Sequence, residues 1–269
     1  MNKKGQPKKR KLKLKAKILI RLLLVILVFV AVLFYVLNID TKNIVIKGTT
    51  NIKDAEIIRI SGLKDYPKLF KLNKKKIKDN IKTNPLVDDV KIKRNIFGKI
   101  TIDIKESKIL FFYKYDNKFV TASGNRVDNN EDYYGYPTLI NFTPDTIFEG
   151  FVNGLNKVDY EIIKMINEIE YNPYKSQNGN TIDNNRFILK MNDQNTVYID
   201  IPNIKNLNKY TTIIATPDME KTKGIVYLDT MNDQIVFRSY DAIQKEQEDL
   251  TKKNEENEEE NEDKKETGD

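Results

Sequence analysis

The segment Asn84–Glu106, NPLVDDVKIKRNIFGKITIDIKE, decides the fold because it contains two alternating segments joined by a short connector. In its second half, polar residues separate Ile100, Ile102 and Ile104, and the first half shows a similar alternation. Such alternation is typical of a strand with one buried face. The connector, residues 95–99, is short and contains a glycine, so the two strands should form an antiparallel hairpin.

The residues before this hairpin predict one more strand and two helices. Residues 44–46 alternate with polar neighbours and stop at Gly48, as in a short strand that ends in a turn. Residues 52–60 have apolar side chains at helical spacing, and a second helix beginning at about residue 73 must stop before Pro85. The order strand, helix, helix, strand, strand predicts an α+β unit with two helices on one face of a three-stranded sheet.

Beyond Glu106 the pattern predicts a mainly antiparallel β domain with two helices, over residues 108–241. Apolar residues at helical spacing predict one helix over 156–171, which Pro173 would end, and a second over 204–216. Apolar segments predict strands at 109–115, 119–121, 187–191, 197–201, 225–228 and 235–238.

A long apolar run precedes both units. The twenty residues Ile18–Leu37 contain one charge, Arg21, which lies next to Leu22 one turn inside the run. A helix of this length spans the hydrocarbon core of a bilayer, and Arg21 can extend back to the headgroups. We therefore predict a transmembrane helix over 18–38.

The flank of this helix predicts its orientation. Residues 1–17 are strongly basic, and Met1–Arg21 as a whole carry ten Lys or Arg and no acid, which keeps the N-terminus cytoplasmic and places the C-terminus outside. A cleavable signal peptide has a similar order of parts. The apolar run is longer than the roughly 7–15 residues typical of such peptides, and residues 38–43 offer no small-residue cleavage site. A retained anchor is the better interpretation.

The charge is divided unevenly along the chain. The whole chain carries +7, but Glu246–Asp269 carry twelve acids and four lysines, which leaves +5 for the residues between the two charged ends. A value this small over more than 200 residues is not typical of a nucleic-acid-binding protein. Residues 242–269 lack apolar periodicity, so we predict a disordered acidic tail, for which docking to a basic partner or binding of cations is an alternative.

The residue types present exclude several kinds of enzyme. The chain contains no Cys, His or Trp, which excludes thiolate nucleophiles, imidazole bases, disulfides and the commonest zinc sites. Asp103 and Glu106 lie three apart in a predicted strand and would face opposite sides. We expect no enzymatic activity, no metal and no cofactor. No serine lies in a nucleophile motif; those inspected are Ser61, Ser107, Ser123, Ser176 and Ser239.

Three motifs stand out in the segment from residue 44 to residue 106: Ile44-x-Ile46-x-Gly48, Asn84-Pro85-x-Val87-x-x-Val90-x-Ile92-x-Arg94 and Ile100-x-Ile102-x-Ile104-x-Glu106. Together they resemble the POTRA domain of a bacterial cell-division family, called FtsQ in Gram-negative and DivIB in Gram-positive organisms. The resemblance implies a POTRA domain over 43–107 of the DivIB type, with structural roles for Gly48, Pro85, Arg94 and Glu106.

The β domain resembles the same family less closely. Thr121 stands where an acidic residue is usual, and Thr230-Met231 replace the usual basic-aromatic pair. The matching motifs are Phe119-Val120-Thr121-x-x-Gly124, Pro137-x-Leu139, Leu207-Asn208-Lys209 and Gly224-x-Val226-Tyr227-x-Asp229.

The resemblance implies a divisome scaffold in the cell membrane at the division septum. Its expected partners are FtsL-like and DivIC/FtsB-like bitopic proteins and, through them, the septal peptidoglycan synthase. A partner strand would add to an edge strand at the far end of the β domain. Core packing remains an equal alternative for residues 235–237. The candidate partner-binding residues are Tyr227, Asp229, Ile235, Val236, Phe237 and Ser239.

A rival function is a membrane-anchored cell-wall-binding or adhesion module. Such a module would need exposed aromatic side chains for glycans. Tyr133, Tyr134 and Tyr136 form the one cluster of that kind in the sequence, and packing within a turn is the simpler explanation for them.

Overall fold

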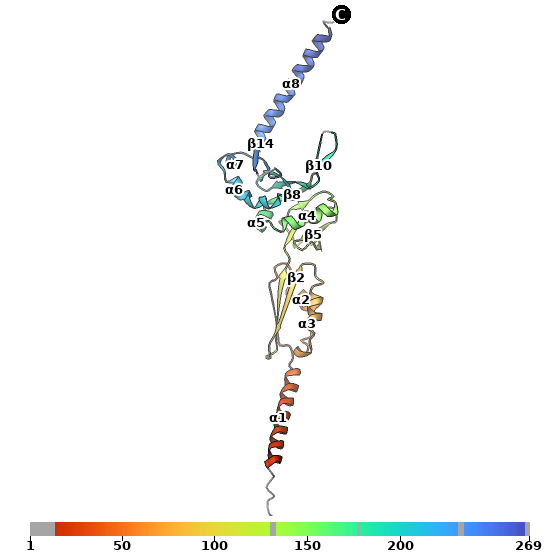
Figure 1. Cartoon of the computed structure of the whole chain (residues 1–269), viewed down its shortest axis with the longest axis vertical. Helices are drawn as coiled ribbons and strands as arrows, with labels where there is room; N and C mark the ends of the chain where they lie inside the picture. The colour runs from red at the N-terminus through yellow and green to blue at the C-terminus, as the bar shows by residue number, and fades with distance from the viewer. Residues whose placement is uncertain (1–13, 130–132, 177, 231–233, 267–269) are drawn as a thin grey trace, which may run out of the picture. The chain divides into compact units, whose positions relative to one another are not determined.

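The computed structural model describes residues 14–129, 133–176, 178–230 and 234–266. The chain divides into two compact units, Met1–Glu106 and Ser107–Asp269. In unit 1, helix α1 (Leu14–Leu37) has no buried residue. Among the described residues it is the one helix long and apolar enough to cross a membrane (Figure 1).

After α1, unit 1 contains the predicted order of strands and helices, so the α+β fold class is confirmed. Its sheet has the order β1-β3-β2, with β1 parallel to β3 and β2 antiparallel to β3. The elements are β1 (Asn43–Lys47), α2 (Asp54–Ser61), the 3-10 helix η1 (Leu69–Lys71), α3 (Lys74–Ile81), β2 (Val87–Arg94) and β3 (Lys99–Glu106).

Local sequence signals end and begin the two helices of this unit. Helix α2 stops at Gly62, which has the left-handed φ of 72° that glycine adopts at little cost. Helix α3 starts after Asn73, whose side chain accepts hydrogen bonds from the backbone N–H groups of Lys75 and Lys76 at 3.0 and 3.2 Å. These caps place Ile77 and the other buried residues of both helices against the sheet.

Two of the predicted structural residues hold the end of unit 1 at which β3 finishes. Gly48 has φ +82°, and a Cβ there would lie 2.0 Å from the backbone oxygen of Ile104. The Glu106 carboxylate accepts hydrogen bonds from the N–H of Thr50 at 2.6 Å and the N–H of Asn51 at 2.9 Å. The turn after β1 is thereby fixed to the end of β3.

The other two predicted structural residues lie at the two ends of β2: Pro85 precedes it and Arg94 is its last residue. Arg94 donates hydrogen bonds to the backbone oxygens of Leu69 and Leu72 at 3.0 and 3.2 Å, and its guanidinium lies 5.1 Å from the centre of the Phe70 ring. It satisfies carbonyl groups at the end of η1. Pro85 lies between the end of α3 and the start of β2.

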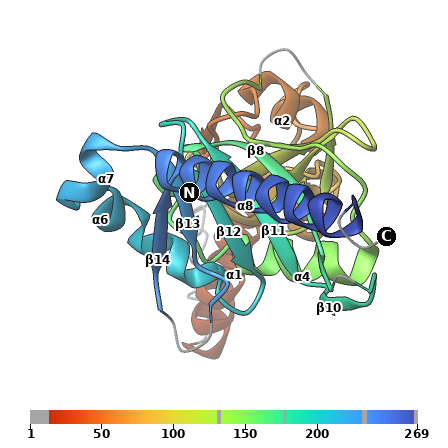
Figure 2. The ribbon, with the colours of Figure 1, turned by 90° about the horizontal axis from the view of Figure 1, so that it is seen from above.

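Unit 2 is built on a nine-stranded sheet of order β14-β13-β12-β11-β8-β7-β4-β5-β6. Figure 2 shows β14, β13, β12, β11 and β8 side by side in that order. A small hairpin, β9 (Tyr174–Lys175) with β10 (Thr181–Asp183), is separate from this sheet. The nine strands are β4 (Ile109–Tyr113), β5 (Lys118–Thr121), β6 (Arg126–Asp128), β7 (Thr138–Leu139), β8 (Ile166–Tyr171), β11 (Arg186–Met191), β12 (Thr196–Asp200), β13 (Gly224–Tyr227) and β14 (Val236–Ser239).

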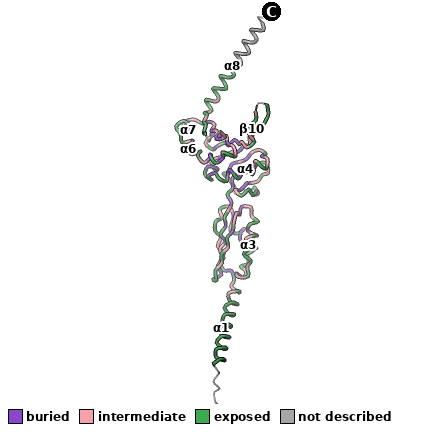
Figure 3. Tube along the Cα trace, viewed as in Figure 1, coloured by how far each residue is buried: buried purple, intermediate pink, exposed green. Residues whose placement is uncertain are grey.

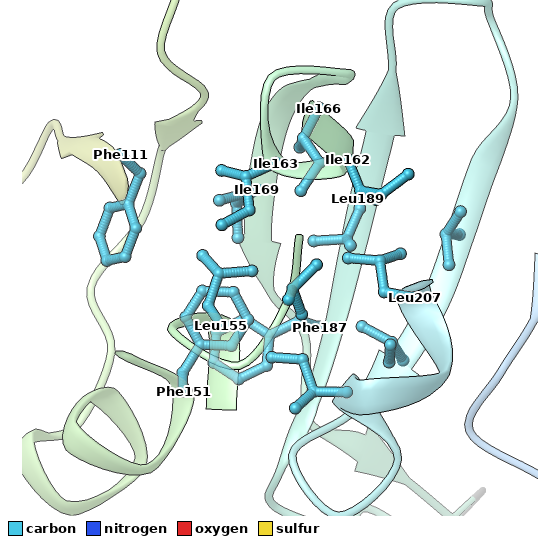
Figure 4. Packing of buried hydrophobic residues seen from close by; sticks show 14 of the residues in the cluster. Phe111, Phe151, Leu155, Ile162, Ile163, Ile166, Ile169, Phe187, Leu189 and Leu207 are labelled. Atoms are coloured by element: carbon cyan, nitrogen blue, oxygen red, sulfur yellow. The ribbon is translucent and has the colours of Figure 1, made fainter. Parts of the chain in front are cut away.

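Aromatic side chains from helix and sheet form the centre of the core of unit 2. Phe151 on α4 stacks on Phe187 of β11 with ring centres 4.0 Å apart, and Phe111 of β4 lies 6.0 Å from Phe151 (Figure 4). All three are fully buried. The helical elements of the unit are α4 (Asp145–Leu155), α5 (Tyr160–Ile163), the 3-10 helix η2 (Ile204–Lys209), α6 (Tyr210–Ile214), α7 (Pro217–Lys221) and α8 (Tyr240–Glu266).

The prediction of one helix over 156–171 is wrong. The chain forms the short helix α5 and then β8, which pairs antiparallel with β11. The register shifts there, so that Ile169 faces Leu189 while Ile166 faces Met191. One extra residue in a strand lets two side chains three positions apart face the same side. Ile166 and Ile169 are both buried, which explains why the sequence imitates helical spacing.

The acidic tail also differs from the prediction of a disordered segment, because the structure continues as helix α8 to Glu266. Glu, Lys and Gln are strong helix formers, and Gln244 donates to Glu248 one turn later at 2.9 Å. The described side chains of α8 are mostly exposed, like those of α1 (Figure 3). Composition therefore predicted the absence of a packed core, but not the local backbone conformation.

We predict that Gly48→Ala destabilises unit 1 more than Gly62→Ala. Both glycines have positive φ, so each change should cost about 1–2 kcal/mol from backbone strain. At Gly62 the new methyl group meets open space, whereas at Gly48 it meets the Ile104 carbonyl. Hydrogen exchange of the β1 and β3 amides in the full chain measures both effects. Equal loss of protection in the two variants would contradict the prediction.

Candidate partner-binding edge

One margin of the nine-stranded sheet is formed by β14. It pairs antiparallel with β13 in the register Gly224 to Ser239, Val226 to Phe237 and Tyr227 to Val236. In an antiparallel pair, only every second residue exchanges backbone hydrogen bonds with its neighbour. The remaining N–H and C=O groups of β14 lie along the outer side of the sheet and can accept another strand.

The side chains at this edge divide into two groups. Ile235 and Val236 are 40% and 41% exposed, and Arg238 is also exposed. Phe237 is half-buried and packs against the core of unit 2. The two interpretations of residues 235–237 therefore apply to different side chains: Phe237 contributes to packing, while Ile235 and Val236 are available at the surface.

The close fit of β13 against β14 explains the position of Phe237. A Cβ on Gly224 would lie 2.8 Å from the Phe237 ring and 2.2 Å from the backbone oxygen of Arg238. The Gly224 N–H donates to the buried amide oxygen of Asn195 at 3.0 Å, which holds the start of β13. A charged residue at position 237 would consequently disturb the fold as well as the surface, so Val236 is the better position for a test.

A pocket of ≈560 Å³ lies beside the predicted residues Tyr227 and Asp229. Its central cation is Arg186, the first residue of β11, whose Nε lies 3.1 Å from the Asp229 Oδ2. The guanidinium lies 4.3 Å from the ring centre of Tyr198 and 5.2 Å from that of Tyr174. Arg186 is thus held by one carboxylate and two aromatic rings.

The pocket contains a largely buried ion pair and, beside it, two further carboxylates, those of Asp183 and Asp200. Both partners are largely buried, with 14% of the Arg186 side chain and 15% of the Asp229 side chain exposed. Burial raises the pKa of Asp229, and the nearby Arg186 guanidinium opposes that rise. Burial also raises the pKa of Asp200, which lines the same pocket together with Asp183.

Stacking connects the pocket to the strand next to the edge. Tyr198 on β12 and Tyr227 on β13 lie with ring centres 5.2 Å apart and ring planes 16° apart. Burial raises the pKa of Tyr198. The ion pair of Arg186 with Asp229 thus links the start of β11 to the segment after β13, across the intervening strand β12.

Sequence reasoning missed Arg186, Tyr198 and Asp200. Tyr227 and Asp229 were expected at the interface, and the structure brings them together at the pocket, while Val236 and Ser239 lie in β14 and Ile235 directly precedes it. The available signal was the arginine directly before the apolar strand Phe187–Met191, a charged residue at the start of a buried element. Its partner lies 43 positions later, which local patterns do not predict.

The rival sites are not assembled by the described part of the chain. Tyr133 and Tyr136 pack edge-on against Phe119, at 5.3 and 5.7 Å between ring centres, while Tyr134 is 86% exposed. The three tyrosines therefore do not form one flat platform. Within the residues that the structure describes, no cluster of three Asp or Glu side chains is arranged to hold a metal ion.

Four of the five serines considered as nucleophiles, Ser61, Ser107, Ser123 and Ser239, have hydrogen bonds within the described residues, whereas the buried hydroxyl of Ser176 has none there. Ser61 donates to the carbonyl of Ile58 in its own helix at 3.0 Å. The hydroxyls of Ser107 and Ser123 lie 3.0 Å apart, next to Thr121, whose hydroxyl is 3.0 Å from that of Ser123. These three hydroxyls link the start of unit 2 to the turn after β5.

Residues 40–107 match the POTRA domain, FtsQ-type. Over 224 residues the chain is 25% identical to the cell division protein DivIB of Listeria monocytogenes, covering 78% of this chain and 77% of that protein. It is 31% identical to DivIB of Clostridium tetani over 169 residues, which cover 63% of this chain and 58% of that protein. Residues 40–107 thus match an FtsQ-type POTRA domain, and over most of its length the chain is similar to DivIB cell division proteins.

Other FtsQ/DivIB relatives match over part of their length. DivIB of Staphylococcus aureus is 23% identical over 222 residues, which cover 78% of this chain and 49% of that protein. The solved major extracytoplasmic domain of the trans isomer of DivIB from Geobacillus stearothermophilus matches with a TM-score of 0.34 and 18% identity, over 44% of this chain and 98% of that chain. The relatives' names support a role in cell division, and the predicted resemblance to the family is confirmed.

We predict that Arg186→Met raises the pKa of Asp229 above its value in the unchanged protein, because the substitution removes the positive charge that favours the ionised carboxylate. A folded-state pKa above the unfolded value means that stability falls as pH rises from the unfolded pKa through the folded one. This fall should therefore extend to higher pH in Arg186→Met. Carboxyl carbon chemical shifts of Asp229 measure the pKa directly.

The matched control for this prediction is Lys190→Met, which removes a positive charge from the same strand. Lys190 lies on β11 with its ammonium 3.2 Å from the Thr196 hydroxyl, and it is not among the charges that shift Asp229. The control should leave the pKa of Asp229 in place. An Asp229 pKa that is unchanged in Arg186→Met would show that the ion pair has no electrostatic effect.

Proposed function

We propose that the chain is a non-catalytic scaffold of the division machinery whose edge strand β14 binds an extended segment of a bitopic division protein. The observation that carries this proposal is a sheet margin with unpaired backbone groups and two exposed apolar side chains, Ile235 and Val236. The partners we propose are FtsL-like and DivIC/FtsB-like proteins, and through them the septal peptidoglycan synthase. At this edge such a partner would present a β-strand with apolar side chains.

We further propose that α1 crosses the cell membrane once, with the basic N-terminus in the cytoplasm and both units outside. The length and apolar surface of α1 support this topology, and so does the basic flank before it. Membrane attachment would confine the β14 edge to the layer in which other single-pass division proteins present their exterior domains. Localisation at the division septum follows as part of the same proposal.

Val236→Asp should weaken binding of the exterior domain of a DivIC-like partner about tenfold, which corresponds to about 1.4 kcal/mol. A carboxylate at this exposed position would be desolvated beneath an added strand, while the free protein loses little because Val236 is already 41% exposed. Isothermal titration with the full chain in detergent measures the affinity, and hydrogen exchange of β14 amides reports whether a strand has been added.

Two controls make this test specific. Val236→Thr keeps the shape and the β-propensity of the side chain and should retain most of the affinity. Phe142→Asp introduces the same charge at another exposed apolar position of unit 2, 55% exposed, and should have no effect. Equal affinities for all variants, or protection of β6 amides in place of β14, would assign the partner to another surface. Preferential retention of the chain by purified cell wall would favour the wall-binding alternative.

A further inference from the structure

Three loops of unit 1 lie directly beside the end of helix α1. The Lys42 N–H donates to the Gly98 carbonyl at 2.7 Å, and the Thr41 N–H donates to the Pro67 carbonyl at 3.1 Å. The Leu69 N–H donates to the Ile39 carbonyl at 2.8 Å. Residues 38–42, 62–76 and 93–99 together are called the helix-proximal end of unit 1, because these hydrogen bonds fix them within a few residues of Leu37.

Large apolar side chains are exposed at this end. Ile96 and Phe97, at the tip of the β2–β3 hairpin, are 59% and 76% exposed, and Tyr66 in the neighbouring loop is 52% exposed. A pocket of ≈420 Å³ separates the hairpin tip from the end of α1 and is lined by Phe97 and Tyr35, among others. A turn of this kind needs neither an isoleucine nor a phenylalanine, and neither side chain contributes to the buried core of unit 1.

Positive charge surrounds these apolar side chains. The helix-proximal end contains ten Lys or Arg residues and two acids, Asp40 and Asp65. Asp40 is already paired with Lys68 at 2.9 Å. The opposite end of the unit, residues 47–54, 79–89 and 103–106, contains four basic residues and six acids. The two ends of one small domain therefore differ in both charge and apolar exposure.

The start of α3 adds to this positive charge against the preference of the helix itself. The partial positive charge of a helix N-terminus is stabilised by acids and destabilised by nearby cations. Helix α3 nevertheless begins with Lys74, Lys75 and Lys76 and has no acid in its first turn. All three side chains are exposed. Repulsion of this kind is expected where a surface is selected to meet an anion rather than to stabilise the fold.

We propose that the helix-proximal end of unit 1 docks on the anionic surface of the membrane that α1 crosses, with Ile96 and Phe97 inserted at the headgroup level. Lysine side chains would contact phosphate headgroups, and the two apolar side chains would enter the boundary of the acyl chains. This inference depends on the proposed membrane anchoring and is independent of partner binding at β14. Docking holds unit 1 at a fixed distance from the bilayer.

A lipid surface fits these observations better than a protein partner does. The chain has five residues between Leu37 and Asn43, and those residues are hydrogen-bonded to the loops that carry the exposed side chains. Any surface that α1 enters is therefore within reach of the hairpin tip. The combination of lysine with exposed aromatic and aliphatic side chains is also the one found in interfacial anchors.

The absence of cysteine from the chain allows a direct test with single-cysteine variants of the full protein. In one variant, Lys99→Cys next to the hairpin tip carries an NBD fluorophore. The labelled protein is reconstituted in two kinds of nanodisc, one of phosphatidylcholine alone and one that also contains 30% phosphatidylglycerol. Lipids with a doxyl quencher on the acyl chain report insertion. We expect about threefold more quenching in the anionic discs than in the neutral discs.

Two label positions provide the reference signals. A label at Val28→Cys, within α1, should be quenched in both lipids, whereas a label at Lys53→Cys, at the opposite end of unit 1, should stay unquenched. An unquenched label at Val28→Cys would overturn membrane anchoring and this inference with it. Quenching at Val28→Cys without quenching at Lys99→Cys would overturn this inference alone.

Surface variants separate the apolar contribution from the charge. Ile96→Ser with Phe97→Ser, and separately Lys74→Glu with Lys75→Glu and Lys76→Glu, should each reduce quenching at Lys99→Cys in anionic discs to the neutral level. The matched charge control is Lys47→Glu with Lys53→Glu and Lys91→Glu, three exposed lysines elsewhere in the unit, which should retain the signal. Equal quenching in neutral and anionic discs would overturn the proposal, and so would an unchanged signal in both test variants. Protection of the label by a purified protein partner in the absence of lipid would also overturn it.

Discussion

Backbone hydrogen bonding across the sheet of unit 2 is the constraint on which the candidate interface depends. The interior strands have neighbours on both sides, and β14 at the margin pairs with β13 alone. Its outer N–H and C=O groups must be satisfied by water or by another strand. The edge can therefore pair with another chain, whether a partner or an aggregating copy. The exposed valine and isoleucine favour an apolar strand over water, because adding the strand also buries their side chains.

A largely buried ion pair lies among the strands next to that edge. Arg186 and Asp229 join the start of β11 to the end of β13, and the aromatic rings of Tyr198 and Tyr227 cover the same region. Replacing such an ion pair with apolar residues is often neutral for stability, whereas removing one partner is costly. The contribution of such a pair is therefore to the specificity of strand arrangement more than to net stability, and Arg186 and Asp229 connect segments that are distant in the sequence.

Local patterns predicted unit 1 well, because alternation, a helix-stopping proline and glycine turns all act within a few residues. They failed at 156–171, where a bulge in β8 placed Ile166 and Ile169 on one face at a spacing that a helix would also produce. The edge residues were found through resemblance to a family. Arg186 and its pocket were missed, because their contacts join residues from strands distant in sequence, and periodicity contains no information about such contacts.

The two units use one physical principle for different purposes. Each buries most of its apolar side chains against a sheet, and each leaves a pair exposed at its candidate binding surface: Ile235 and Val236 at the β14 edge, Ile96 and Phe97 beside α1. Unit 2 also exposes apolar side chains away from β14, Phe142 and Ile182 among them. The surroundings of the two pairs differ. The hairpin tip lies among lysines, which suits an anionic lipid surface, while β14 offers free backbone groups, which lipid cannot pair and a protein strand can. Charge and backbone hydrogen-bonding capacity, more than apolar exposure itself, therefore distinguish a surface for membrane from a surface for protein within this chain.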